Sequence, residues 1–220
     1  MGEYFWIHPT ARKGLAAVLI GFLSWWVIPA RGDKEFKRSQ HALRSVKSWS
    51  YVVSTTNGNL KHREYSEVSC ASGQHTVTTY HSENGQSGNL EQLSANGANY
   101  VRNKGNGPWQ FVNYTSSANN VSCWQMSMEM DAPPFPDFNN MLKFGKLERG
   151  EKKTIGGTVC QSWTVSMTRP GGTPETRSVC IGVSDHLPRE LVTAYGRTTY
   201  SDFNAPIRIE RPVVLQASAD

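Results

Sequence analysis

Apolar and polar side chains alternate through the last third of the chain, in the pattern of β-strands that bury one face. Between residues 158 and 168, Trp163, Val165 and Met167 are separated by single polar residues. A period of two places these three side chains on the same face of a strand. Three more strands are expected over residues 175–183, 187–195 and 197–203. A turn at residues 169–174, with two prolines and two glycines, separates the first two of the four.

Shorter alternating segments, bounded by Gly and Asn turns, occupy the first half of the chain. Trp49 and Tyr51 share one face of the first segment, and Trp109 and Phe111 share one face of the last. Strands are expected over residues 49–56, 60–70, 75–80, 90–93, 98–101 and 109–112. Short strands at this spacing predict an antiparallel meander.

The clearest alternation in the sequence lies between residues 123 and 130. Trp124, Met126 and Met128 share one face there, and the other face is mostly polar. Methionine adapts its shape to variable apolar neighbours, so this stripe fits either a packed core or the lining of an apolar ligand site. Both interpretations place these residues on a strand.

One amphipathic helix is expected near the start of the folded region, over residues 33–47. Phe36, Leu43 and Val46 form its apolar stripe, and basic side chains cover much of the remaining surface. A helix with such a stripe must lie on another part of the protein.

A second helical segment interrupts the strand pattern between residues 131 and 144. Its prolines exclude a central strand, and Asp137 is expected to cap a short helix over residues 138–143. The segment also carries Phe135, Phe138 and Met141, so it is too apolar to stand alone in water. The sequence therefore predicts a plug or lid over the concave side of the sheet, which we call the lid segment.

The composition is that of one folded, β-rich domain. The chain has 220 residues, of which 38% are apolar and 19% are charged, a low charged fraction for a disordered chain. The formal net charge is +5, yet the basic residues form no block of the kind that binds nucleic acid. A surplus of this size suits either an ordinary solvated surface or contact with an acidic membrane surface.

The first 30 residues predict a targeting segment. Arg12 and Lys13 precede an uncharged run over residues 14–30 that ends in Ile28-Pro29-Ala30. This order fits a cleaved signal peptide, and the length of the run also fits a retained anchor in the inner membrane. Both alternatives place a domain over residues 31–212 in the periplasm or another exported location. Residues 213–220 are expected to form a disordered tail.

Four cysteines in an exported chain indicate two disulfides. Cys160 and Cys180 lie almost symmetrically about the turn near residue 171, so they are predicted to face each other across a hairpin. That leaves Cys70 to pair with Cys123. A zinc site is the weaker alternative, because no two of these cysteines have the short spacing of zinc ligands.

No motif in the sequence indicates catalysis or a bound metal. Asp185, His186 and Glu190 are close enough along the chain for acid–base chemistry, but they fit a turn between two strands better. His75 and His81 fall at opposite ends of one expected strand, which does not suit a metal site. Neither a nucleophile elbow nor a phosphate loop is present. We therefore expect a non-enzymatic protein without a cofactor.

The order of these elements resembles the LolA/LolB/LppX-like half-barrel proteins, which are the outer-membrane lipoprotein-sorting carriers and their relatives. Residues 42–51 look like the family's first helix running into its first strand. Residues 156–165 and 200–207 look like the strand after its central insert and its closing strand. The resemblance covers residues 34–212, and it rests on order and pattern without a catalytic motif. The four cysteines, and the lack of a cysteine for lipid attachment, depart from some members.

The resemblance implies an α+β, mostly antiparallel fold: a curved half-barrel sheet with an N-terminal helix and a short helical plug on its concave side. It also implies a carrier in the cell envelope that shields the acyl chains of a lipid or lipoprotein in an apolar cavity. We expect Phe135, Phe138 and Met141 of the lid segment to close this cavity, because the segment supplies apolar residues that belong to no strand. The residues expected to line it, here called the cavity residues, are Trp49, Tyr51, Trp109, Phe111, Trp124, Met126, Met128, Trp163, Val165 and Met167.

A second class of function is compatible with the same fold. A sensor or interaction domain held at the membrane would contact an envelope protein in place of a lipid. Retention of the leader as an anchor would favour this alternative, whereas a co-purifying lipid would favour the carrier.

Overall fold

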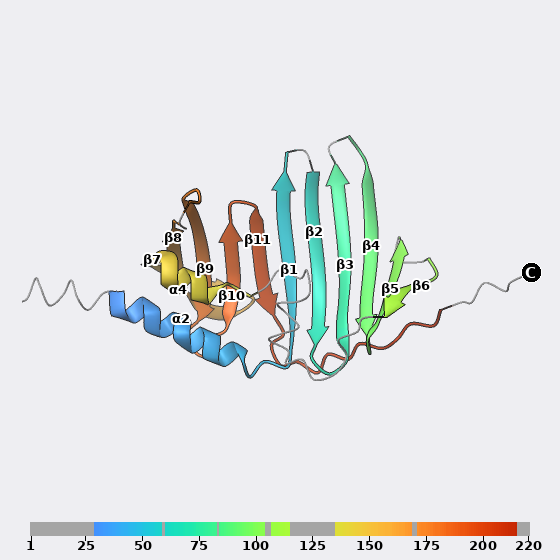
Figure 1. Cartoon of the computed structure of the whole chain (residues 1–220), viewed down its shortest axis with the longest axis horizontal. Helices are drawn as coiled ribbons and strands as arrows, with labels where there is room; N and C mark the ends of the chain where they lie inside the picture. The colour runs from blue at the N-terminus through green and yellow to red at the C-terminus, as the bar shows by residue number, and fades with distance from the viewer. Residues whose placement is uncertain are drawn as a thin grey trace, which may run out of the picture.

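Eleven antiparallel strands form one continuous open sheet in the computed structural model (Figure 1). The structure describes residues 29–58, 60–82, 84–103, 107–114, 135–168 and 171–214, with side chains from residue 32 onward. Residues 1–28, which hold most of the predicted leader, lie outside the described part of the chain. None of the described helices is long and apolar enough to cross a membrane.

The sheet consists of two meanders that meet at its centre. The N-terminal meander comprises β1 (Ser48–Asn57), β2 (Leu60–Ser69), β3 (Gly73–Ser82), β4 (Ser87–Ala95), β5 (Ala98–Asn103) and β6 (Gln110–Tyr114). The C-terminal meander comprises β7 (Gly145–Ile155), β8 (Thr158–Met167), β9 (Glu175–Gly182), β10 (Pro188–Thr193) and β11 (Gly196–Ser201). The first strand pairs with the last, which gives the order β6-β5-β4-β3-β2-β1-β11-β10-β9-β8-β7.

Two helices lie over the C-terminal meander: α2 (Pro29–Leu43) and α4 (Phe138–Phe144). Figure 1 shows both at the end of the sheet that carries β7 to β10. The predicted fold class is confirmed, because the chain forms a mostly antiparallel open sheet with an N-terminal helix and a short second helix.

Helix α2 ends at Leu43, four residues before the predicted end at Lys47. The backbone N–H groups of Arg44 and Ser45 bond to carbonyls three residues back, at 3.2 and 3.1 Å. This tighter geometry ends the helix, and it leaves room for a short connection before β1. Val46 still packs in the core, with only 4% of its surface exposed, so the apolar stripe was recognised correctly although the helix boundary was not.

Helix α4 begins where its cap was predicted. The Asp137 side chain accepts a hydrogen bond from the Asn140 backbone N–H at 3.1 Å, which satisfies one of the unpaired donors of the first turn. At the other end, the Gly145 N–H donates to the Met141 carbonyl. The lid segment therefore passes directly from this helix into β7.

Strand β7 was not predicted from the sequence. Charged residues dominate it, so it shows no clear apolar alternation. It is nevertheless a strand because it pairs along β8 and forms one edge of the sheet. Charged side chains at an edge strand oppose pairing with other chains, so this composition suits its position.

The strand register defines which residues share a face of the sheet. Across the N-terminal meander, Trp49 is opposite Val68, and Val68 is opposite Gln74. These side chains lie on the face that both helices cover, here called the helix face. Leu93 and Tyr100 lie directly opposite each other on β4 and β5. Their side chains are on the other face of the sheet, here called the outer face.

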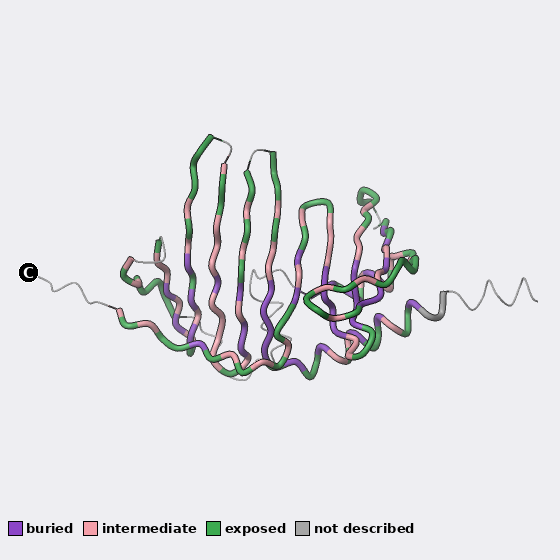
Figure 2. Tube along the Cα trace, turned by 180° about the vertical axis from the view of Figure 1, so that it is seen from behind, coloured by how far each residue is buried: buried purple, intermediate pink, exposed green. Residues whose placement is uncertain are grey.

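Each face carries its own buried apolar cluster. The larger cluster fills the space between the helix face and both helices, and it includes Phe36, Tyr51 and Val165. The smaller cluster contains Leu93, Tyr100 and Ile209 on the outer face. Figure 2 shows the buried residues toward one end of the long strands, whereas the far ends of β1 to β4 are largely exposed.

The C-terminal segment from residue 202 runs along the end of the N-terminal meander (Figure 1). The Ile209 backbone N–H donates to Ser72 Oγ at 3.0 Å, and the Arg211 guanidinium donates to the Asn96 carbonyl at 2.8 Å. These bonds hold Ile209 against the smaller cluster.

Candidate functional site

Five of the cavity residues and the three lid residues come together in the larger apolar cluster. Their apolar side chains are almost completely buried between the sheet and the helices. These residues are Trp49, Tyr51, Trp163, Val165, Met167, Phe135, Phe138 and Met141. We call this region the apolar layer.

Aromatic contacts attach the lid segment to the sheet. The Phe135 ring centroid lies 4.9 Å from that of Trp49 and 5.5 Å from that of Tyr200. The Phe138 ring meets Phe36 of α2 edge to face, with centroids 5.1 Å apart. Such pairs add about 0.5–1.5 kcal/mol each beyond the burial of their area, so side-chain packing contributes strongly to the attachment of the lid.

Two cavity residues lie away from the apolar layer. Trp109 packs on the outer face, where the Arg102 guanidinium stands 4.5 Å from its ring centroid. Phe111 is 44% exposed and contacts Tyr100, also on the outer face. Trp124, Met126 and Met128 lie outside the described residues, so their part in the cavity stays a prediction.

A polar cluster that the sequence did not reveal adjoins the apolar layer on the helix face. Tyr51 Oη donates to Glu64 Oε1 at 3.1 Å. The Gln74 amide donates to Tyr51 Oη at 3.1 Å and to Ser66 Oγ at 3.0 Å. Burial, the largest effect, raises the pKa of the Tyr51 phenol above its ordinary value, and the nearby Glu64 raises it further. The helix face therefore changes from apolar to polar at Tyr51.

The predicted disulfide between Cys160 and Cys180 is confirmed, with Cα atoms 5.5 Å apart. It joins β8 to β9 on the outer face, opposite the lid. Cys70 is also disulfide-bonded. Because Cys123 lies outside the described residues, the pairing of Cys70 with Cys123 stays a prediction.

The residues considered for catalysis bind different neighbours. Asp185 pairs with Arg189 of β10, and Glu190 pairs with Lys153 on the outer face. His186 bonds to Glu35 of α2 instead. Within the described residues, no group of three or more His, Cys, Asp or Glu side chains could hold a metal ion.

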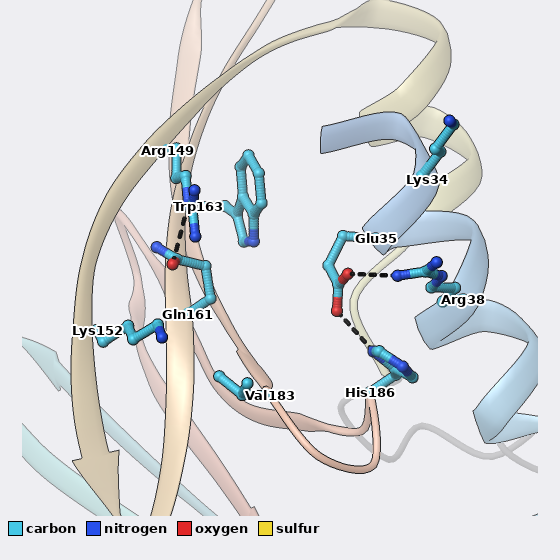
Figure 3. A pocket seen from close by; sticks show the side chains of 9 residues that line it. All are labelled: Lys34, Glu35, Arg38, Arg149, Lys152, Gln161, Trp163, Val183 and His186. Carbon is cyan, nitrogen blue, oxygen red and sulfur yellow. Dashed lines mark hydrogen bonds and ion pairs between the residues drawn. The ribbon is translucent and has the colours of Figure 1, made fainter. Parts of the chain in front are cut away.

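A pocket of about 510 Å³ opens between α2 and the β7 end of the sheet (Figure 3). Its walls come from α2, β7, β8 and the turn between β9 and β10. The lining side chains are Lys34, Glu35, Arg38, Arg149, Lys152, Gln161, Trp163, Val183 and His186. We call it the cationic pocket, because four of these side chains are lysine or arginine.

A β-bulge directs two of these cations into the pocket. Residues three apart in a regular strand point to opposite faces. In β7, however, the register shifts between Arg149 and Lys152, so that Arg149 lies opposite Trp163 and Lys152 opposite Gln161. Trp163 and Gln161 share the helix face, and the bulge therefore places both cations there.

Gln161 holds the bulge in shape. Its side-chain amide donates to the Gly150 carbonyl at 2.6 Å, and its Oε1 atom accepts a hydrogen bond from Arg149 Nε at 3.0 Å. Because this partner is neutral, the charge of Arg149 is not compensated. No apolar alternation marks this part of β7, so the pocket could not be predicted from the sequence.

Glu35 is the acidic side chain of the pocket. It accepts a hydrogen bond from His186 Nδ1 at 2.7 Å and lies 3.7 Å from the Arg38 guanidinium. Figure 3 shows these two interactions on the α2 side, with Arg149 and Lys152 on the opposite wall.

The fold and the site together define an open antiparallel half-barrel with a helix-covered apolar layer. Comparison with solved structures then identifies it as a LolA/LppX-like fold. The structure of LprF from Mycobacterium bovis matches with a TM-score of 0.57 at 14% identity, over 83% of this chain and 97% of that one. The Mycobacterium tuberculosis lipoprotein LppX matches with a TM-score of 0.52 at 14% identity, over 81% and 97% of the two chains. No protein-family model and no curated protein sequence matches the chain.

Proposed function

We propose that this protein is a lipid-binding carrier of the cell envelope, which shields an acyl chain between its sheet and its lid segment. The observation that carries this proposal is the apolar layer: a continuous set of apolar side chains on the helix face, covered by two helices instead of a second sheet. Similarity in fold to the lipoprotein LppX supports the location in the cell envelope.

An acyl chain would enter where the lid segment now packs. Helix α4 has only seven residues, and the rings of Phe135 and Phe138 occupy the space above the sheet. Movement of this segment would expose Trp49, Val165 and the other members of the apolar layer. The energy lost from the lid contacts would be offset by burial of the acyl chain, at about 0.8 kcal/mol for each buried CH₂ group.

An exported location follows from the same proposal. The buried disulfide between Cys160 and Cys180 is typical of proteins that fold in oxidising compartments. We place the carrier in the periplasm or an equivalent space, either free or tethered by residues 14–30.

The decisive experiment is mass spectrometry of the organic extract of the full chain, purified from an envelope fraction. We expect an acyl lipid in an amount comparable to that of the protein. An extract without acyl lipid, together with no binding of a fluorescent fatty acid, would overturn the proposal. An interaction domain on the same fold would then take its place.

Two neighbouring positions on β8 give a matched pair of variants for the fatty-acid assay. Val165 is fully buried under the lid, whereas Ser166 is exposed on the outer face. Val165→Phe fills the layer at an overpacking cost of about 1–3 kcal/mol, and we expect it to weaken binding of the probe. Ser166→Phe introduces the same ring on the same strand and is expected to bind as the wild type does. Equal binding by both variants would place the ligand elsewhere.

A further inference from the structure

The lysine and arginine side chains that line the cationic pocket outnumber the acidic side chains that line it. Among the described residues, Lys34, Arg149 and Lys152 form no ion pair. The carboxylate of Glu35 forms an ion pair with Arg38 and a hydrogen bond with His186. A concentration of cations that face one another across a pocket is unfavourable unless an anion binds between them.

A buried donor at the base of the pocket also lacks a partner. Trp163 is 5% exposed, yet its indole Nε1 makes no hydrogen bond within the described part of the chain. Figure 3 shows this nitrogen directed toward the space between the sheet and α2. An unpaired buried donor costs about 1–3 kcal/mol, so an oxygen atom that reached this N–H would be stabilised.

The same indole connects the pocket to the apolar layer. Its ring packs edge to face against Phe36, with centroids 6.0 Å apart. Trp163 is thus a member of the apolar layer and also part of the pocket wall. A molecule that filled both sites would need an anionic end and an apolar end.

We propose that the cationic pocket binds the phosphate headgroup of a lipid whose acyl chain passes Trp163 into the apolar layer. This inference rests on the proposed function and names the class of lipid. Arg149 presents a planar guanidinium that matches two oxygens of a phosphate, and Lys152 and Lys34 supply point charges. Arg38 neutralises the charge of the Glu35 carboxylate. Trp163 Nε1–H donates to a phosphate oxygen after a small shift of the side chains that cover it.

The bulge in β7 is what assembles this site. A regular strand would have turned either Arg149 or Lys152 to the outer face. Gln161 acts as a positioning residue, because it bonds to both the bulge backbone and Arg149. The pocket is therefore a built feature of the helix face.

The test compares three probes on the full chain by isothermal calorimetry. They are dioctanoyl phosphatidic acid, dioctanoyl glycerol, which has the same acyl chains without the phosphate, and inorganic phosphate. We expect the phosphatidic acid to bind at least about tenfold more tightly than the glycerol. We also expect the difference to shrink as salt is added, and inorganic phosphate to compete only weakly.

Charge reversal at two lysines of β7 provides the matched variants. Lys152 lies in the pocket, whereas Lys146 lies on the outer face, with 79% of its side chain exposed. Lys152→Glu is expected to remove most of the preference for phosphatidic acid while binding of dioctanoyl glycerol persists. Lys146→Glu changes the net charge by the same amount and is expected to keep the preference. Trp163→Phe, which retains the ring but not the N–H, is expected to reduce it several-fold.

The outcomes separate this inference from the proposed function. Equal binding of both lipids would contradict the phosphate site but not the proposed carrier function. Binding of inorganic phosphate as tight as that of phosphatidic acid would assign the pocket to free phosphate and also overturn the lipid headgroup. Failure of both lipids to bind would overturn the carrier itself and this inference with it. Loss of the preference in Lys146→Glu would show that only net charge matters, against a specific site.

Discussion

Glu35 of α2 and His186 of the turn between β9 and β10 lie 2.7 Å apart, although 151 residues separate them in the sequence. This bond joins the first helix to the C-terminal meander beside the cationic pocket. It fixes the position of the helix wall relative to the strand wall.

Loss of this bond should loosen α2. We expect His186→Ala to lower the free energy of unfolding by about 0.5–1.5 kcal/mol, the net value of one hydrogen bond. Arg38→Ala should change it by less than about 0.5 kcal/mol, because that side chain is 61% exposed and its contact with Glu35 is longer. Urea denaturation measures both values, and an equal effect of the two variants would contradict this role of His186.

Gly145 marks a close approach between the lid and the sheet. A Cβ atom there would stand 2.6 Å from Val165 Cγ1 and would also meet the Met141 carbonyl oxygen. Because a backbone carbonyl cannot rotate away, Gly145→Ala should cost about 1–3 kcal/mol and displace α4. Gly150→Ala on the same strand is the control, since its Cβ would make an ordinary contact at 3.4 Å with Ser162. Thermal unfolding that showed equal losses would argue against the tight junction.

Two buried phenols should make the protein sensitive to alkali. Burial raises the pKa of both Tyr51 and Tyr200 above the ordinary value of 10.0. A raised pKa in the folded state means that these tyrosines stabilise the fold fully below about pH 10. That stabilisation is lost as the pH rises toward the folded-state pKa, because the unfolded chain ionises first.

The expected slope is up to about 1.4 kcal/mol per pH unit for each of the two groups. Tyr51→Phe should flatten the decline of the unfolding free energy between about pH 10 and about pH 11. Tyr195→Phe, at a position 79% exposed, should leave the decline unchanged. An identical decline in wild type and Tyr51→Phe would show that Tyr51 does not contribute.

The disulfide between Cys160 and Cys180 should stabilise the hairpin of β8 and β9. Replacement of both cysteines by alanine should lower the free energy of unfolding by about 2–4 kcal/mol in the chain-entropy model, for a sequence separation of 20. Guanidinium denaturation checks this value. A loss below about 0.5 kcal/mol would mean that the unfolded chain gains little freedom from the change.

Peptide mapping without reduction checks the second disulfide. We expect one peptide pair that contains Cys70 and Cys123 and another that contains Cys160 and Cys180. A peptide that links Cys70 to Cys160 or Cys180 would contradict the predicted pairing.

The sequence was most informative where a single strand buries one face. The alternation of Trp163, Val165 and Met167 predicted β8 and its buried side, because period two is a property of one strand alone. It could not show that Trp109 and Phe111 lie on the other face from Trp49. The relation between strands depends on register, and a shift of one residue exchanges the faces.

The charged composition of β7 is the reason that the rest of the site could not be predicted from the sequence. Strand β7 lacks an apolar pattern since its residues line a sheet edge and a polar pocket. The bulge between Arg149 and Lys152 depends on pairing with β8, so nothing local in the sequence marks it. The apolar layer could thus be predicted in part, whereas the cationic pocket could not.

The pairing of β1 with β11 sets the order in which the sheet can be completed. On the ribosome, β1 emerges long before residues 196–201, so one of its edges has no partner until β11 has been synthesised. Contacts between such distant segments form slowly, and an open strand edge invites pairing with other chains. The sheet therefore stays incomplete until β11 has been synthesised, and aggregation competes with folding during this interval.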